Sequence, residues 1–153
     1  MLDSEMEPKI GDFGIAKIVS DSDEDSRNSK IVGTLGYIAP ENAYSVQLTE
    51  KSDVYSYGVL LLELFCRKMP VDPSFEEGLD IVFWVRKNLQ RSNNFLCFLD
   101  EEISLWDVEE QWKALKIMDL ALQCAQLEAT TRPAMRDVVR SLVELNHKCK
   151  EKK

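Results

Sequence analysis

The first residues in the chain whose types and spacing could do chemistry are Asp12, Phe13 and Gly14, which follow a short apolar stretch. A carboxylate such as that of Asp12 is a hard oxygen ligand, and hard cations such as Mg²⁺ prefer ligands of this kind. The same triplet also occurs by chance, as a surface turn in which glycine adopts a positive φ angle. The triplet alone therefore leaves two hypotheses open, a cation ligand and a plain turn.

Hydroxyl-bearing residues follow soon after the triplet. The stretch SDSDEDSRNSK, residues 20–30, is charged and rich in serine, and it cannot bury enough apolar surface to offset the entropy lost on ordering. We therefore expect a mobile loop there. The stretch IVGTLGYIAPENA, residues 31–43, mixes glycines and a proline with apolar residues, which is typical of a structured loop packed on the rest of the chain.

Further motifs follow the triplet in a definite order: GTLGYIAPE at residues 33–41, KSDVYSYG at 51–58 and TRP at 131–133. In this order and at these intervals, the set resembles the protein-kinase family, whose activation segment runs from Asp-Phe-Gly to Ala-Pro-Glu. The local sequence around these motifs is similar to that of plant leucine-rich-repeat receptor-like serine/threonine kinases. The resemblance covers nearly the whole chain, so it favours the cation-ligand hypothesis for Asp12 over a chance turn.

The resemblance implies roles for the residues of the activation segment, 12–41. Asp12 would ligate Mg²⁺ that bridges the phosphates of ATP, with Phe13 packed beneath it and Gly14 allowing the loop to swing. The matching segment carries hydroxyls that added phosphate or a substrate could address: Ser20, Ser22, Ser26, Ser29, Thr34 and Tyr37. Thr34 resembles the substrate-facing threonine, whereas we interpret Tyr37 as a packing aromatic. For each single serine, an unmodified solvated hydroxyl is an equal alternative.

The resemblance also implies three structural supports. Glu41 and Arg132 match a buried ion pair that ties the end of the activation segment to the last helices. Asp53 matches an aspartate that caps the central helix and hydrogen-bonds the catalytic loop. We expect these residues to hold the fold rather than to act on substrate. His147, the only histidine, is expected at the surface.

The elements that must position these residues are mainly helical. The stretch at residues 52–68 is apolar on nearly every side, so we expect a central helix buried on every side, with Ser52 or Asp53 as its N-cap. Apolar residues at 79–90 recur at helical spacing, and Asp80 is a candidate cap. A short strand at Lys9 and Ile10 is the β element that we expect.

Two more helices are predicted after an irregular stretch at residues 91–108. The helix at 109–127 places on one face Trp112, Leu115, Met118, Ala121, Leu122 and Ala125. The helix at 132–148 does the same with Met135, Val138, Val139, Leu142 and Val143. The fold class implied is mainly α, the helical C-lobe of the protein-kinase fold with a small β element at its N-terminus and no N-lobe. Residues 1–147 would be a partial kinase domain and 148–153 a basic tail.

Composition limits the partners and the compartment. The chain has 153 residues and a formal charge of −8, which argues against nucleic acid or an anionic membrane as its main partner. Protein substrates or partner kinases are expected instead. The cysteines are widely spaced, at Cys66, Cys97, Cys124 and Cys149, which excludes metal-finger spacing and favours reduced thiols. With neither a signal peptide nor a membrane span visible, we expect a cytoplasmic chain, at the cytoplasmic face of the plasma membrane in any full-length parent receptor.

The departures from the kinase pattern bear on activity. The sequence contains no G-x-G-x-x-G, no V-A-I-K lysine and no H-R-D catalytic loop, so of the directly catalytic set only Asp12 remains. ATP and Mg²⁺ belong to the intact family domain, and their binding by this chain is in doubt. One hypothesis is the C-terminal portion of a receptor-like serine/threonine kinase, inactive as an isolated chain. The alternative is a non-catalytic interaction module that binds partners through Thr34–Glu41 and the helix Leu79–Leu89.

Overall fold

Four α-helices dominate the part of the chain that the structure, a computed structural model, describes: residues 2–11, 33–43, 49–91 and 98–147. Among these residues no strand forms, and the one β pairing is an isolated antiparallel bridge between Leu2 and Pro8. The strand predicted at Lys9 and Ile10 is therefore wrong. Both residues are exposed and gain no partner strand that could turn a bridge into a ladder.

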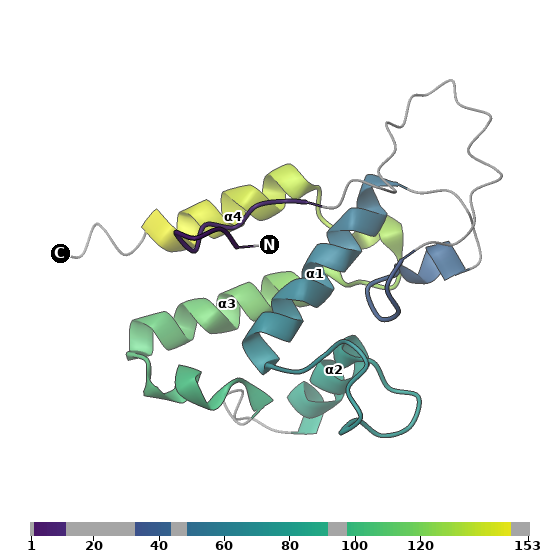
Figure 1. Cartoon of the computed structure of the whole chain (residues 1–153), viewed down its shortest axis with the longest axis horizontal. Helices are drawn as coiled ribbons and strands as arrows, with labels where there is room; N and C mark the ends of the chain where they lie inside the picture. The colour runs from purple at the N-terminus through teal and green to yellow at the C-terminus, as the bar shows by residue number, and fades with distance from the viewer. Residues whose placement is uncertain (1, 12–32, 44–48, 92–97, 148–153) are drawn as a thin grey trace.

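Helix α1, Glu50–Cys66, runs through the middle of the molecule (Figure 1). Its N-cap is Thr49, whose extended backbone (φ −132°, ψ 160°) precedes the first turn, and the left-handed Arg67 (φ 50°) ends the helix. The predicted cap at Ser52 or Asp53 is wrong. Ser52 lies inside the first turn, where its hydroxyl is engaged by Asn42 instead.

The burial of α1 is extensive but one-sided. Val54, Val59 and Leu62 are at most 2% exposed, as expected for the central helix. Leu60 and Leu64, by contrast, are 42% and 64% exposed. The prediction that α1 is buried on every side is therefore wrong, because the described elements cover only part of its circumference and leave one apolar stripe facing solvent.

Helix α3, Val108–Cys124, makes the most extensive contact with α1. Its first turn is capped by Asp107, whose Oδ1 accepts the N–H of Glu110 at 2.9 Å. The two helices approach closely at Gly58, where a β-carbon would lie 2.7 Å from the carbonyl oxygen of Ala121 and 2.8 Å from Cβ of Cys124. Only glycine fits this crossing without a shift of the backbone.

Helix α2, Ile81–Arg91, begins where the sequence predicted. The carboxylate of Asp80 accepts the N–H of Phe83 at 2.8 Å, so the predicted cap is confirmed. The loop before α2 is held by aromatic contacts, since the ring of Trp84 stacks on Phe75 at 5.1 Å and meets Phe98 edge-on at 6.1 Å. This packing joins α2 to the main core.

Helix α4, Met135–His147, packs by a narrower face than its sequence suggested. Val138 is fully buried in a small cluster with Val54, Leu120 and Cys124. Leu142 is half-buried against the same cluster, whereas three other apolar positions predicted on that face are exposed: Met135 at 38%, Val139 at 52% and Val143 at 47%. The face prediction is therefore wrong for these three, because α4 meets its neighbours along one edge. Trp112 of α3 departs in the same way, at 42% exposed.

Two cysteines are buried in the described core, and the length and apolar character of the described helices bear on whether any of them could span a membrane. Cys66 and Cys124 are free and buried, and burial raises their pKa values to about 12 and about 11. Cys97 and Cys149 lie outside the described residues. Across the described ranges, no helix combines the length and the apolar character that crossing a membrane requires.

Candidate functional site

The candidate site is the segment Thr34–Glu41 and the helices that hold it. A tight turn forms where the N–H of Tyr37 donates to the carbonyl of Thr34 at 3.1 Å. Gly36 in this turn has φ +94°, and a β-carbon there would lie 2.6 Å from Cβ of Pro70. Glycine is thus required both by the backbone angle and by the close approach of the chain that follows α1. The segment ends in the short 3-10 helix η2, Pro40–Ala43.

An ion pair fixes the end of this segment. Both carboxylate oxygens of Glu41 accept from the guanidinium of Arg132, each at 2.7 Å. The side chain of Arg132 is fully buried, whereas that of Glu41 is 27% exposed. The residues lie 91 positions apart, so this bidentate pair closes a long loop between the front of the described chain and its last helices.

Arg132 has every one of its five N–H donors satisfied. Besides Glu41, it donates to the backbone carbonyls of Gln126 at 2.7 Å, Lys51 at 2.9 Å and Leu127 at 3.1 Å. The ring of Tyr55 lies 5.0 Å from the guanidinium carbon and adds a cation–π contact. A buried charge is tolerated where its donors are all paired, and this arrangement meets that condition.

The first turn of α1 supports the same corner from the other side. Lys51 donates its ammonium to the carbonyl of Arg132, and the hydroxyl of Ser52 donates to Oδ1 of Asn42 at 2.8 Å. Asn42 and Ser52 are both buried. The hydrogen bonds from Arg132 hold the pKa of Glu41 below its ordinary value of 4.5, against the opposing effect of burial. Glu41 is therefore ionised at neutral pH.

A second anchor holds the middle of the segment. The phenol of Tyr37 donates to the carboxylate of Glu63 on α1, and the hydroxyl of Ser56 donates to the carbonyl of Tyr37 at 2.7 Å. Burial, followed by the hydrogen bond to Glu63, raises the pKa of Tyr37 to about 12. Tyr37 thus packs and donates as a neutral phenol on the side of α1 that faces the segment.

Sequence reasoning missed four residues of this site: Asn42, Lys51, Ser56 and Glu63. Glu63 did leave a signal, because it is the one charged residue in the apolar run VLLLELF, residues 59–65. A carboxylate in such a run needs a polar partner when its helix is buried. Nothing in the local pattern named Tyr37 as that partner.

The structure describes only some of the predicted site residues. Asp12, Phe13 and Gly14 lie outside the described residues, as do Ser20, Ser22, Ser26 and Ser29. Thr34 is exposed in the turn, and Asp53 is exposed in the first turn of α1. Within the described ranges, no group of three His, Cys, Asp or Glu side chains could hold a metal ion.

Comparison with known proteins identifies the class. The family model for the protein kinase domain matches residues 1–143, and the chain belongs to the protein kinase family. The resemblance seen in the motifs is thereby confirmed, and the four helices are the helical C-lobe of the kinase fold.

Individual relatives narrow the class to receptor-like kinases. The chain is 43% identical to the leucine-rich repeat receptor-like protein kinase PEPR1 of Arabidopsis thaliana over 96% of its length. It is 44% identical to a receptor-like protein kinase of Ipomoea nil over 93%, and 40% identical to the LRR receptor-like serine/threonine-protein kinase RGI1 of Arabidopsis thaliana over 96%. The chain spans only 12–14% of the length of these relatives.

Proposed function

We propose that these residues are the C-terminal part, 1–147, of the catalytic domain of a serine/threonine receptor-like kinase, followed by a basic tail at 148–153. Their task in that domain is to hold the segment that receives the protein substrate. The observation that carries the proposal is the bidentate Glu41–Arg132 pair, which fixes the end of that segment to the helical core. In a parent receptor the domain would lie at the cytoplasmic face of the plasma membrane.

The geometry of the segment suits this task. Phosphoryl transfer depends mainly on positioning and charge stabilisation, so the surface that presents the acceptor hydroxyl has to be rigid. Here Tyr37 and Glu41 anchor the segment at two points on α1 and on Arg132. Thr34, one turn before the first anchor, is exposed and free to face a substrate.

ATP and Mg²⁺ would supply the transferred phosphoryl group and its charge neutralisation in the complete domain. Asp12 is the candidate ligand for Mg²⁺, with Phe13 and Gly14 beside it. Ser20, Ser22, Ser26 and Ser29 are candidate positions for regulatory phosphate in the activation segment. These assignments rest on the family resemblance.

A polypeptide of these 153 residues should not transfer phosphate by itself. The reaction needs a lysine for the phosphates, a base for the acceptor hydroxyl and two Mg²⁺ sites, and the sequence supplies only Asp12. The test is incorporation of radiolabelled phosphate from ATP into a generic protein substrate with Mg²⁺ or Mn²⁺. We expect none above background. Incorporation by the wild type that disappears in Asp12→Ala would overturn this part of the proposal.

A non-catalytic interaction module is the second candidate. It is favoured by two exposed apolar side chains near the proposed binding elements, Leu35 at 76% and Phe83 at 57%. Binding of partner kinase domains to the purified chain can be measured by calorimetry for the wild type, Leu35→Ser and Phe83→Ser. Binding that both variants weaken, without any phosphoryl transfer in the complex, would favour the module. Restoration of Asp12-dependent transfer in the complex would favour the kinase.

A further inference from the structure

An apolar stripe runs along the outer side of α3 and continues into a pocket against α2. Four apolar residues and one acid recur at helical spacing, which puts them on one side of α3: Val108, Trp112, Leu115, Asp119 and Leu122. The last three line a pocket of about 400 Å³ together with Trp112, Lys116 and Met118 of α3 and with Leu89 near the end of α2. This volume lies in the range of about 300–1,000 Å³ that binding sites typically occupy. We call the five residues Val108, Trp112, Leu115, Asp119 and Leu122 the α3 stripe.

The α3 stripe has the composition of an interaction surface. Trp112 is 42% exposed and Val108 is 83% exposed, and just before the helix Leu105 and Trp106 are 84% and 45% exposed. Tryptophan is enriched among the residues that dominate binding energy at protein interfaces, particularly beside pockets that an anchor side chain can fill. The ammonium of Lys116 lies 5.5 Å from the centroid of the Trp112 ring, so this cation–π contact already covers one face of the indole and helps to fix its orientation.

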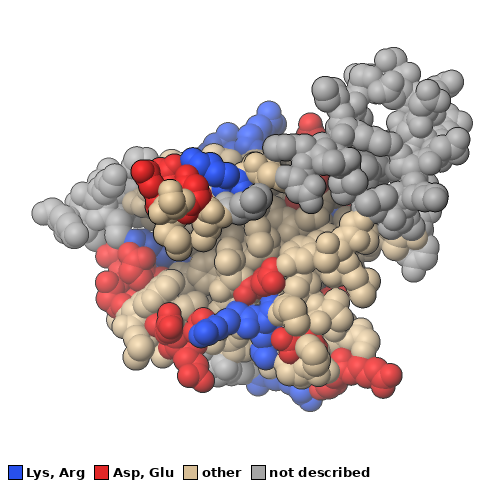
Figure 2. All heavy atoms as spheres, in the orientation of Figure 1, with Lys and Arg blue, Asp and Glu red and all other residues tan. Residues whose placement is uncertain are grey.

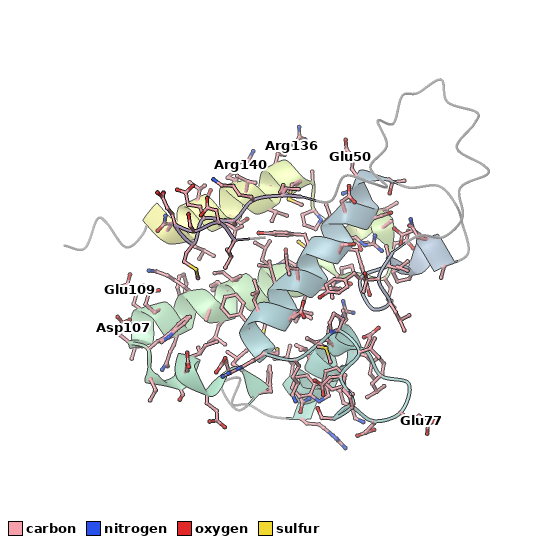
Figure 3. All side chains as sticks on the ribbon, in the orientation of Figure 1. Glu50, Glu77, Asp107, Glu109, Arg136 and Arg140 are labelled. Atoms are coloured by element: carbon pink, nitrogen blue, oxygen red, sulfur yellow. The ribbon has the colours of Figure 1, made fainter. Side chains whose placement is uncertain are left out.

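The surroundings of the stripe are acidic. Residues 101–119 contain six carboxylates and two lysines, a formal charge of −4. One of the lysines, Lys113, is already paired with Glu110 at 2.6 Å. Figures 2 and 3 show acidic side chains gathered where α3 begins, with Asp107 and Glu109 projecting outward there. At the other end of the stripe, the guanidinium of Arg86 on α2 donates to the carbonyls of Leu122 at 3.4 Å and of Ala125 at 3.2 Å.

We propose that the α3 stripe binds a basic amphipathic helix from a protein partner. The helix would place one apolar anchor in the pocket beside Trp112 and lay its apolar face along Val108 and Leu115. Its lysine or arginine residues would lie toward Asp107 and Glu109 rather than toward Arg86, because the acidic charge is concentrated at the start of α3. Apolar burial supplies affinity in such a complex, and charge complementarity supplies orientation and selectivity.

Fluorescence anisotropy with labelled helical peptides tests this inference on the full 153-residue chain. The probe is a peptide of about 14 residues with leucines at helical spacing and lysines on their flanks, and its control carries glutamates in place of the lysines. Trp112→Ala removes the anchor site and Asp119→Lys reverses a charge on the pocket rim. Val139→Ala and Glu77→Lys are the matched controls, an exposed apolar residue of α4 and an exposed acid before α2; Figure 3 shows Glu77 at the opposite side from Glu109.

We expect the basic peptide to bind and the acidic one not to bind. Trp112→Ala and Asp119→Lys should each weaken binding about tenfold or more, whereas both controls should stay within about twofold of the wild type. Circular dichroism checks that each variant is folded, and Asp119→Lys keeps the test valid if Trp112→Ala is not. Equal binding of both peptides, equal loss in the Glu77→Lys control, or no binding of the basic peptide would overturn the proposal. So would a dimer of the chain that dissociates in Trp112→Ala, because a second copy would then be the occupant.

Discussion

Removing either partner of the Glu41–Arg132 pair should destabilise the chain strongly, and removing both should cost much less than the sum. Glu41→Ala would leave two buried N–H donors and a buried positive charge without their acceptor. Arg132→Ala would take the guanidinium donors away from Glu41 and from the backbone carbonyls of Gln126 and Leu127. Breaking a buried pair in this way costs about 3–5 kcal/mol, which is a large share of the roughly 5–15 kcal/mol that stabilises a domain.

The coupling energy, rather than either single loss, isolates the pair. Because each single variant already loses the two 2.7 Å hydrogen bonds, we expect a coupling of about 2–3 kcal/mol in the double-mutant cycle. Exchanging both residues for apolar ones should still cost stability here, since the carbonyls of Gln126 and Leu127 would lose their guanidinium donor.

Urea unfolding at pH 7, followed by far-ultraviolet circular dichroism, gives the four free energies of the cycle. The matched control is the exposed pair Asp137–Arg140, whose side chains are 42% and 66% exposed and whose coupling should stay below about 1 kcal/mol. Additivity of Glu41→Ala and Arg132→Ala within about 0.5 kcal/mol would refute the reasoning, as would a coupling no larger than that of the control pair.

Three further predictions concern the crossing of α1 with α3, acid and the buried thiols. Gly58→Ala should lower the free energy of unfolding by about 1–2 kcal/mol, because its β-carbon would lie 2.7 Å from the carbonyl oxygen of Ala121. The urea midpoint should fall accordingly, and an unchanged or raised midpoint would contradict this. Folding depresses the pKa of Glu41, so the contribution of the ionised Glu41 to the free energy of unfolding is complete above a pH of about 4.5 and is lost as the pH falls through the folded pKa. The stability difference between wild type and Glu41→Gln should therefore shrink from pH 7 to pH 3. A constant difference would count against the pair. In a Cys97→Ser/Cys149→Ser background, Cys66 and Cys124 should react with a thiol reagent at pH 8 only in urea, because burial raises their pKa values to about 12 and about 11; fast labelling of the native chain would show that they are accessible.

The sequence predicted the helical architecture because its signals are local. Asp80 caps α2 as its position before an apolar run indicated, and the motif order led to the C-lobe and to the pairing of Glu41 with Arg132. The motifs could specify a contact across 91 positions only through resemblance, since no propensity or periodicity relates two such distant residues.

The rest depended on tertiary packing that a single sequence does not reveal. Periodicity marks an apolar stripe but not how much of it a neighbour covers, which is why Leu64 and Val139 are exposed on helices that looked more deeply buried. The sequence position of Ser52 made it a candidate N-cap of α1. In the structure its hydroxyl donates to Asn42 instead, and the N-cap is Thr49. The hydrogen-bond partner of Glu63, Tyr37, likewise comes from a separate loop, so the local sequence around Glu63 could not name it.

The central claim, that these residues form the substrate-holding part of a kinase domain, is tested most directly by completing that domain. The preceding kinase-domain residues of a receptor-like kinase relative would be joined to this chain, and transfer of radiolabelled phosphate to protein would be measured beside the intact domain of that relative. We expect transfer by the folded chimera to serine or threonine, its loss in Asp12→Ala, and a strong reduction in Glu41→Ala. A folded chimera that transfers no phosphate while the relative's own domain does, or one whose transfer survives Asp12→Ala, would contradict this claim.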